Sequence, residues 1–366
     1  MTNGEKIRVL IADDSAFMRK VMVSILEAEG SFEIVGEARD GRETVEKAAK
    51  LKPHAITMDI NMPHMDGLQA TEVIMSTDPR PILIVSAESK DGADATLRAL
   101  ELGAIDFIAK PSSGVDLDMS SVREEMVRKL RIASKVRVVR NLLRSVPPKI
   151  ARVTPSPMDF AAAPVTNGTR LPVAVLAAST GGPATLMKLI PEFPANFPAA
   201  ILVVQHMPGT FTSQFAEQLS AVSLNPVKHA VHGDVLLAGH VYVCPGDCHL
   251  RVVPPGRIVL DNGPRIAGYR PCIDVTLESV AALVGSNSVV AILTGMGSDG
   301  ARGVMAIQEN GGLVLAQDEA SSVIFGMPSE AIKTGAVGQV LPLDQIAAAI
   351  VRRVASPLAS ARLTAR

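Results

Sequence analysis

Three side chains that together can catalyse acyl transfer each follow an apolar run in the second half of the chain. Ser179 comes after "LPVAVLAA", His206 comes after "AAILVVQ", and Asp299 lies in a glycine-rich loop after "VVAILTG". If these runs are parallel strands, their carboxyl ends meet at one edge of a sheet. Ser179 would then attack a carbonyl, His206 would take its proton, and Asp299 would orient the imidazole.

Each of these residues has a commoner role when it stands alone. A serine before a helix is usually a cap, a histidine after a strand is usually a hydrogen-bonded surface residue, and an aspartate among glycines usually belongs to a turn. Their joint placement favours catalysis. The chain order Ser, His, Asp differs from the Ser, Asp/Glu, His order of the α/β-hydrolases, which predicts a different fold with the same chemistry.

The loop that contains Asp299 also reads "GMGSDG", a G-x-G-x-x-G string of the kind that binds dinucleotides. Asp318 lies near the spacing at which an acid meets a ribose in such sites. Against this alternative, the string leaves little chain for the rest of a Rossmann sheet, and Asp299 would put a negative charge beside the pyrophosphate. A nicotinamide-dependent oxidoreductase is therefore the weaker alternative, because it also leaves Ser179 and His206 unexplained.

The first half of the chain carries a different cluster at its predicted strand ends. Asp13 and Asp14 follow the first apolar run, Asp59 ends the third, Ser86 ends the fourth and Lys110 ends the fifth. Three carboxylates at one edge repel one another unless a hard cation such as Mg²⁺ lies between them. A lysine and a hydroxyl beside them suit an incoming phosphoryl group. Asp59 is predicted to be the nucleophile that forms an acyl phosphate.

The elements that must position these residues alternate between strand and helix patterns. Five strands are predicted in the first half, over residues 7–12, 32–38, 54–59, 81–87 and 105–110, and helices over 15–30 and 66–77 are among those between them. A second alternation starts at residue 171 and runs nearly to the C-terminus. We therefore expect an α/β protein with two doubly wound parallel-sheet domains.

Between the two halves lies a segment with another composition. Residues 120–145 form a basic amphipathic pattern, which we interpret as the last helix of the first domain; a helix that binds a partner or a membrane surface is the alternative. Residues 146–170 are rich in Pro, Ala and Thr and read as a flexible linker. The predicted limits are 6–126 for the first domain, 127–169 for a helical and then flexible linker, and 170–360 for the second domain.

The composition of the 366 residues excludes several classes of protein. The formal net charge of −1 gives no overall basic field for nucleic acid. Three cysteines are too few and too uneven for a disulfide framework, which favours a cytoplasmic protein. No signal-peptide pattern or long apolar stretch is present, so neither export nor insertion into a membrane is expected.

The strings "ADDS", "MDINMPHMDG", "VSA" and "AIDFIAKP" resemble the receiver domain of response regulators. The resemblance implies a flavodoxin-like fold, phosphorylation of Asp59 by a histidine kinase with Mg²⁺, and rearrangement of Ser86 and Phe107 in response. In many receivers an acidic residue stands two positions after the phosphorylated aspartate, where this chain has Asn61.

The strings "ASTGGP", "VVQHMPGTFTSQFA", "GHVYVCPGDCHL" and "ILTGMGSDGARG" resemble the catalytic domain of the chemotaxis protein-glutamate methylesterases. The resemblance implies a Rossmann-like domain that hydrolyses γ-glutamyl methyl esters on methyl-accepting chemotaxis receptors without a cofactor, and in some members deamidates glutamine. It also implies that Thr180 helps to hold the imidazole and that the backbone N–H of Met296 donates to the oxyanion. Ala177 stands where the family usually has glycine, a change that leaves the chemistry intact.

Control of the esterase by the receiver is a further expectation: the unphosphorylated receiver blocks the triad, and phosphorylation relieves the block. A response regulator whose second half only binds a partner is the non-catalytic alternative. His229 and His232 could ligate a metal with Cys244 and Cys248, but their irregular spacing favours ordinary surface roles.

Overall fold

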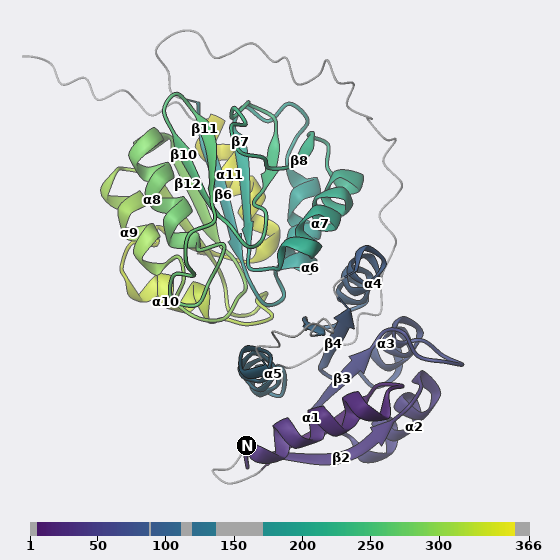
Figure 1. Ribbon diagram of the computed structural model, residues 1–366. Helices are drawn as coiled ribbons and strands as arrows, with labels where there is room; N and C mark the ends of the chain where they lie inside the picture. The colour runs from purple at the N-terminus through teal and green to yellow at the C-terminus, as the bar shows by residue number, and fades with distance from the viewer. Residues whose placement is uncertain (1–5, 88, 111–118, 137–170, 356–366) are drawn as a thin grey trace, which may run out of the picture. The chain divides into compact units, whose positions relative to one another are not determined.

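The alternating strand and helix patterns produce two parallel sheets, one in each half of the chain (Figure 1). The computed structural model describes residues 6–87, 89–110, 119–136 and 171–355. The chain divides into two units, Met1–Val146 and Pro147–Arg366. The predicted flexible linker and the part of the basic segment beyond residue 136 lie outside the described residues, and the domain limits stay predictions.

The first unit is built on a five-stranded parallel sheet in the order β2-β1-β3-β4-β5. Its strands are β1 (Ile7–Ala12), β2 (Phe32–Ala38), β3 (Ala55–Asp59), β4 (Ile82–Ala87) and β5 (Asp106–Lys110). Its helices are α1 (Ala16–Ala28), α2 (Gly41–Leu51), α3 (Gly67–Thr77), α4 (Lys90–Glu101) and α5 (Met119–Ala133). The predicted flavodoxin-like fold is confirmed, and the strand order reverses between β1 and β3, where such sheets bind ligands.

Local polar groups start the helices that follow the acidic strand ends. Ser15 accepts the Met18 N–H as the N-cap of α1, and Asp66 forms a capping box with Gln69 at the start of α3. Helix α5 is linked to the residue after α1, because Glu29 receives ion pairs from Arg123 and Arg131. The predicted basic helix is thus part of the first unit up to Ala133, as the simpler interpretation expected.

The second unit is built on a seven-stranded parallel sheet in the order β14-β13-β12-β6-β7-β9-β8. The strands are β6 (Val173–Ala178), β7 (Ala200–Gln205), β8 (Val227–His229), β9 (Val241–Val243), β12 (Ser288–Ile292), β13 (Leu313–Gln317) and β14 (Gln339–Leu341). An antiparallel hairpin joins β10 (His249–Val253) and β11 (Arg257–Asp261). The parallel, Rossmann-like sheet was predicted, whereas the hairpin was not.

Helices cover both faces of this second sheet (Figure 1). One face is covered by α6 (Gly182–Leu189), α7 (Gly209–Val222) and α11 (Leu343–Ala355), and the other by α8 (Ile273–Val284), α9 (Ala301–Glu309) and α10 (Met327–Lys333). The central strands β6, β7 and β12 are buried along their whole length. This explains why they read as continuous runs of Val, Ile, Leu and Ala.

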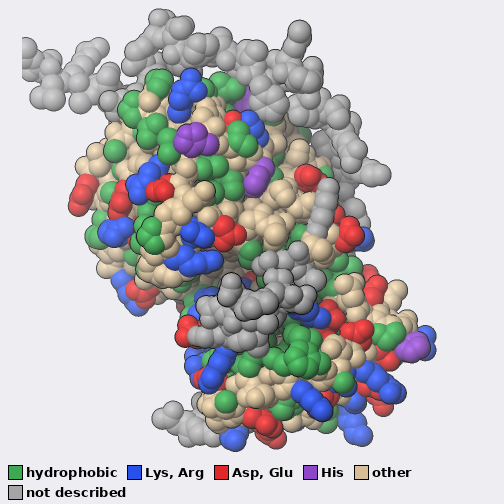
Figure 2. All heavy atoms as spheres, in the orientation of Figure 1, with side chains coloured by type: hydrophobic (Ala, Val, Ile, Leu, Met, Phe, Trp, Pro, Cys, Tyr) green, Lys and Arg blue, Asp and Glu red, His purple; other side chains and the backbone are tan. Residues whose placement is uncertain are grey.

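The face drawn in Figure 2 has no field of one charge. Lys, Arg, Asp and Glu side chains are interspersed on the face drawn in Figure 2, in keeping with the net charge of −1. Within the described ranges, the helices all fall short of the length and apolar character that crossing a membrane requires.

We predict that Leu202→Ala lowers the free energy of unfolding of the second unit by about 2–5 kcal/mol, because Leu202 lies fully buried in the core beside β6. Urea unfolding followed by tyrosine fluorescence reports this unit selectively, since the chain has no tryptophan and both tyrosines, Tyr242 and Tyr269, lie in it. Val231→Ala, at a half-exposed position, is the control and should change stability by under about 0.5 kcal/mol. Equal effects of the two substitutions would contradict the described core.

Candidate active site

Ser179 is held between the ends of two neighbouring strands. It follows β6 directly, and its N–H donates to the Thr294 carbonyl beyond β12 at 3.1 Å. Its own carbonyl accepts from Gly182 N at 2.8 Å and from Gln205 Nε2 at 2.9 Å. A Cβ at Gly295 would lie 2.8 Å from Ser179 Cβ, so the two loops are in close contact there. The sheet order reverses between β6 and β12, which makes this edge the expected ligand position.

His206 and Asp299 are joined by a direct hydrogen bond. His206 follows β7, Asp299 lies in the loop between β12 and α9, and His206 Nε2 is 2.8 Å from Asp299 Oδ2. An ionised carboxylate can only accept, so Nε2 carries the proton and Nδ1 of the neutral ring is the basic nitrogen. Nδ1 is buried and has no hydrogen-bond partner within the described residues. The ring is therefore prepared to accept one proton at Nδ1.

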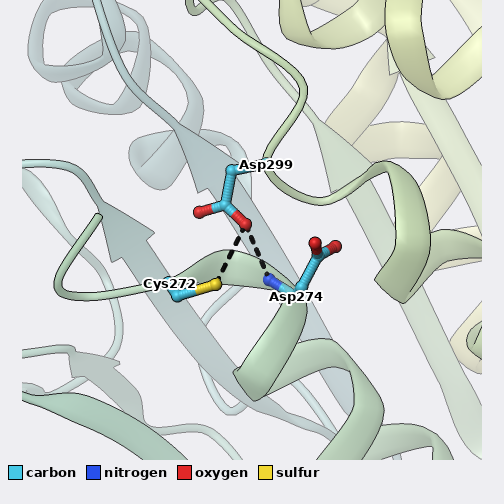
Figure 3. Close-up of side chains that lie close together, drawn as sticks. All are labelled: Cys272, Asp274 and Asp299. Atoms are coloured by element: carbon cyan, nitrogen blue, oxygen red, sulfur yellow. Dashed lines mark hydrogen bonds between the residues drawn. The ribbon is translucent and has the colours of Figure 1, made fainter. Parts of the chain in front are cut away.

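The carboxylate of Asp299 also holds the start of α8. It accepts the Ile273 N–H at 2.7 Å, the Asp274 N–H at 3.0 Å and the Cys272 thiol at 3.2 Å (Figure 3). Burial alone would raise the pKa of Asp299, but the hydrogen bond from His206, the positive charge of this ring when it is protonated, and the two N–H groups outweigh burial and lower this pKa. The positive end of the α8 dipole acts in the same direction. Asp299 is thus a fixed negative charge beside the imidazole.

Cys272, Asp274 and Asp299 lie close enough together to raise the question of a metal site, since their ligand atoms are within 4.8 Å of one another. The hydrogen bonds already described occupy both oxygens of Asp299. Asp274 Oδ1 accepts the Gly303 N–H at 2.7 Å. Burial, and then the charge of Asp299, raise the pKa of Asp274. The closeness of Cys272, Asp274 and Asp299 is therefore explained by hydrogen bonds at the starts of α8 and α9.

Thr180 and Met296 lie next to this cluster, although their expected roles stay predictions. Thr180 is buried, and its carbonyl accepts Thr294 Oγ1 at 3.0 Å. Met296 follows Gly295, the residue that packs on Ser179. No hydrogen bond joins Ser179 Oγ to His206 in the part of the chain that the structure describes, so the structure brings His206 and Asp299 together directly and Ser179 to the same sheet edge.

Two residues that were not predicted from the sequence contact His206 or its neighbours. Tyr269 stacks on His206 with ring centroids 4.2 Å apart and 15° between the planes. Gln205 is buried and donates to the carbonyls of both Ser179 and His206. Gln205 could have been found from the sequence, because it is a polar residue at the end of an apolar run, directly before His206. Nothing in the local sequence pattern pointed to Tyr269.

The acidic residues of the first unit also gather at the edge of their sheet. Asp13, Asp14 and Asp59 each offer a carboxylate oxygen, and these atoms lie within 4.8 Å of one another. Lys110 Nζ is 2.9 Å from Asp13 Oδ2 and 2.8 Å from Asp59 Oδ2. Burial raises the pKa of Asp59, and Asp13 adds to this, although Lys110 opposes it. Burial acts to lower the pKa of Lys110, but its two ion pairs prevail and raise it.

The two predicted switch residues are both buried. Ser86 Oγ donates to the Gly92 carbonyl in α4 at 3.2 Å, and the Phe107 ring is 4% exposed. Lys129 of α5 holds the backbone at Phe107, because its Nζ donates to the Phe107 carbonyl and pairs with Asp106 Oδ1 at 3.1 Å. The same Nζ lies 5.2 Å from the centre of the Phe107 ring. Ser86 therefore contacts α4, and Phe107 contacts α5.

The four residues considered as a second metal site have separate contacts. His229 Nε2 is 3.0 Å from Thr212 Oγ1, and His232 Nδ1 accepts the Leu260 N–H at 3.4 Å. The thiols of Cys244 and Cys248 donate to the Pro245 carbonyl. The described residues contain no metal-ligand group made from these four.

Comparisons with known proteins match both halves of the chain. The family described as "CheB methylesterase" matches residues 174–350, and "Response regulator receiver domain" matches residues 9–120. A protein-glutamate methylesterase/protein-glutamine glutaminase of Pyrococcus abyssi is 45% identical over 96% of this chain and 94% of its own length. A protein of the same name from Symbiobacterium thermophilum is 43% identical over 95% of this chain and 97% of its own. The chain belongs to this family.

A solved structure is also similar to the second half. The catalytic domain of CheB methylesterase from Thermotoga maritima is 40% identical, with a TM-score of 0.48, and the match covers 50% of this chain and 98% of that one. Membership of the methylesterase family, together with the use of the Asp299 carboxylate for His206 and α8, rules against the nicotinamide alternative for "GMGSDG".

We predict that Cys272 resists alkylation in the folded protein. Burial, and then the charge of Asp299, raise the pKa of this thiol from its usual 9.0 to about 12, so the thiolate at pH 8 should be about 10³-fold scarcer than in the unfolded chain. Iodoacetamide labelling at pH 8, read by peptide mass spectrometry with and without denaturant, measures this. Above pH 9 the unfolded chain ionises first, so the contribution of Cys272 to stability is lost as the pH rises from 9 towards 12.

Asp299→Asn is the matched variant, because removal of the charge should lower the pKa of Cys272 and speed its labelling. Cys272 labelling at the same rate in folded and unfolded protein would contradict the described site.

Proposed function

We propose that the chain hydrolyses γ-glutamyl methyl esters on methyl-accepting chemotaxis receptors, under the control of phosphorylation at Asp59. The observation that carries the proposal is the His206–Asp299 hydrogen bond at 2.8 Å, at the sheet edge where Ser179 ends the neighbouring strand. The relatives' name, protein-glutamate methylesterase/protein-glutamine glutaminase, supports the substrate class. The proposed limits are 6–126 for the receiver, 127–169 for the linker and 170–360 for the esterase.

In the first step, Ser179 Oγ attacks the ester carbonyl and its proton passes to Nδ1 of His206. Asp299 stabilises the imidazolium that forms, and the Met296 N–H donates to the oxyanion, a contribution of roughly 3 kcal/mol for one preorganised donor. Thr180 helps to hold the ring. The C–O bond to the methoxy group then breaks, and the proton from His206 leaves with methanol.

In the second step, water attacks the acyl-enzyme while His206 takes a proton from it. The Ser179–acyl bond breaks, Ser179 regains its proton and the glutamate carboxylate is released. These steps use protein groups alone, without a cofactor for the esterase. The same steps on a glutamine side chain release ammonia instead of methanol, and we include this glutaminase activity in the proposal because the relatives' name contains it.

Phosphorylation at Asp59 is the second part of the proposal. A histidine kinase supplies the phosphoryl group. Asp13, Asp14 and Asp59 would hold Mg²⁺, which would offset the negative charge of the carboxylates and the phosphate. Lys110 contacts Asp13 and Asp59 and can pair with a phosphoryl oxygen. Ser86 and Phe107 transmit the change to α4 and α5. The protein acts in the cytoplasm and binds no nucleic acid.

We predict that Ser179→Ala reduces methanol release from methylated receptor by about 10⁴- to 10⁶-fold, because the nucleophile of a triad is lost. Ser286→Ala, at an exposed serine, is the control and should retain full activity. A fluorophosphonate probe should label Ser179 in the wild-type protein. In the His206→Gln variant, Ser179 should be labelled much more slowly. Unchanged methanol release in Ser179→Ala would refute the esterase assignment and favour an output half that only binds a partner.

We predict that Asp59→Asn abolishes the rise in methanol release that acetyl phosphate and Mg²⁺ cause in the wild type. Asp13→Asn should lower phosphoryl incorporation at least about tenfold, because it removes one carboxylate from the cation site, and chelation with EDTA should do the same. Glu33→Gln, at an exposed acid in the same unit, should phosphorylate normally. Incorporation that persists in EDTA would argue against a metal-dependent receiver.

A further inference from the structure

Tyr269 touches the catalytic imidazole on its face. The His206 and Tyr269 rings are stacked, with centroids 4.2 Å apart and planes 15° from parallel. The bond from Nε2 to Asp299 fixes one point of the imidazole, but a single hydrogen bond permits rotation about its own axis. Such a rotation would move Nδ1, the nitrogen that must meet the serine proton. A flat partner on the face of the ring opposes it.

The other end of Tyr269 lies against the loop that carries the expected oxyanion donor. Gly297 has φ +91°, and a Cβ at this position would lie 2.5 Å from the Tyr269 hydroxyl. The phenol therefore packs directly on the backbone next to Met296. The Tyr269 side chain therefore lies between the His206 imidazole and the backbone at Gly297. A side chain at Gly297 would displace the Tyr269 phenol.

The segment that carries Tyr269 is held at several points. Tyr269 and Ile266 exchange backbone hydrogen bonds of 2.9 and 3.1 Å around a turn with positive φ at Ala267 and Gly268. Arg270 Nη1 donates to the carbonyls of Asn262 and Gly263. These contacts hold the backbone that carries Tyr269.

His249 anchors the same segment from the hairpin β10–β11. This buried ring contacts the Pro264 carbonyl through Nε2 at 3.0 Å and accepts the Cys272 N–H at Nδ1. The Tyr269 segment and the start of α8, which Asp299 holds, are therefore attached to one side chain.

We propose that Tyr269 is a positioning residue for the esterase, which holds the plane of the His206 imidazole by stacking and keeps it at a set distance from the Met296–Gly297 loop. This inference rests on the proposed hydrolysis at Ser179. It assigns the effect to the aromatic ring, so a flat ring without the hydroxyl should preserve most of the function.

The test compares Tyr269→Leu and Tyr269→Phe in the full-length protein, phosphorylated with acetyl phosphate and Mg²⁺. We expect Tyr269→Leu to lower kcat for methanol release by about 10- to 100-fold, the effect of a misplaced reacting group. KM should change by less than about twofold, since receptor binding is not altered. Tyr269→Phe should stay within about threefold of wild type. The rate of fluorophosphonate labelling at Ser179 should follow kcat across the series.

A merely structural role gives a different pattern. Equal loss in Tyr269→Phe and Tyr269→Leu, an effect on KM alone, or wild-type labelling of Ser179 in Tyr269→Leu would overturn the proposal. Tyr269→Met is a second non-aromatic variant in case Tyr269→Leu does not fold, as judged by circular dichroism, and the same losses are expected for it. If wild type itself releases no methanol, the esterase function has failed instead, and the two failures are thereby distinguished.

Discussion

The carboxylate of Asp299 is the interaction on which the catalytic half depends. It binds the imidazole of His206 and at the same time accepts two N–H groups and a thiol from the first turn of α8. A buried charge is costly unless it is paired and hydrogen-bonded, and here the same contacts that satisfy it also define the site. The position of the start of α8 and the orientation of the His206 ring therefore depend on the same carboxylate. Moving α8 would remove hydrogen-bond donors from Asp299.

Both units place their chemistry by the same geometric rule. In each sheet the strand order reverses between two neighbours, β1 and β3 in the first unit and β6 and β12 in the second, and the polar residues follow these strands or the strands beyond them on one side. The two sites differ in how they treat charge. The first gathers several carboxylates, two of which contact Lys110, whereas the second stabilises one ionised carboxylate with hydrogen bonds from the protein itself.

The residues at strand ends were predictable because buried strands can be recognised in the sequence as apolar runs. A strand covered on both faces is a continuous apolar run, so its end, and hence Ser179, His206, Asp299 or Asp59, can be located without coordinates. Tyr269 and Cys272 could not be located this way. They follow the hairpin β10–β11 in a segment without strand or helix periodicity, whose path depends on distant contacts such as His249 with Pro264.

The ring nitrogen of His206 that binds Asp299 could not be predicted from the sequence either. Because Nε2 is bonded to Asp299, Nδ1 is left buried without a partner among the described residues, a condition that costs about 1–3 kcal/mol in a folded protein. The carboxylate contacts one edge of the ring and Tyr269 packs on its face, and both contacts oppose rotation of the ring. In the proposed mechanism, the unsatisfied nitrogen is the one that receives the serine proton. If so, the fold keeps a buried polar atom without a partner in the described part of the chain at the position where the reaction would give it one.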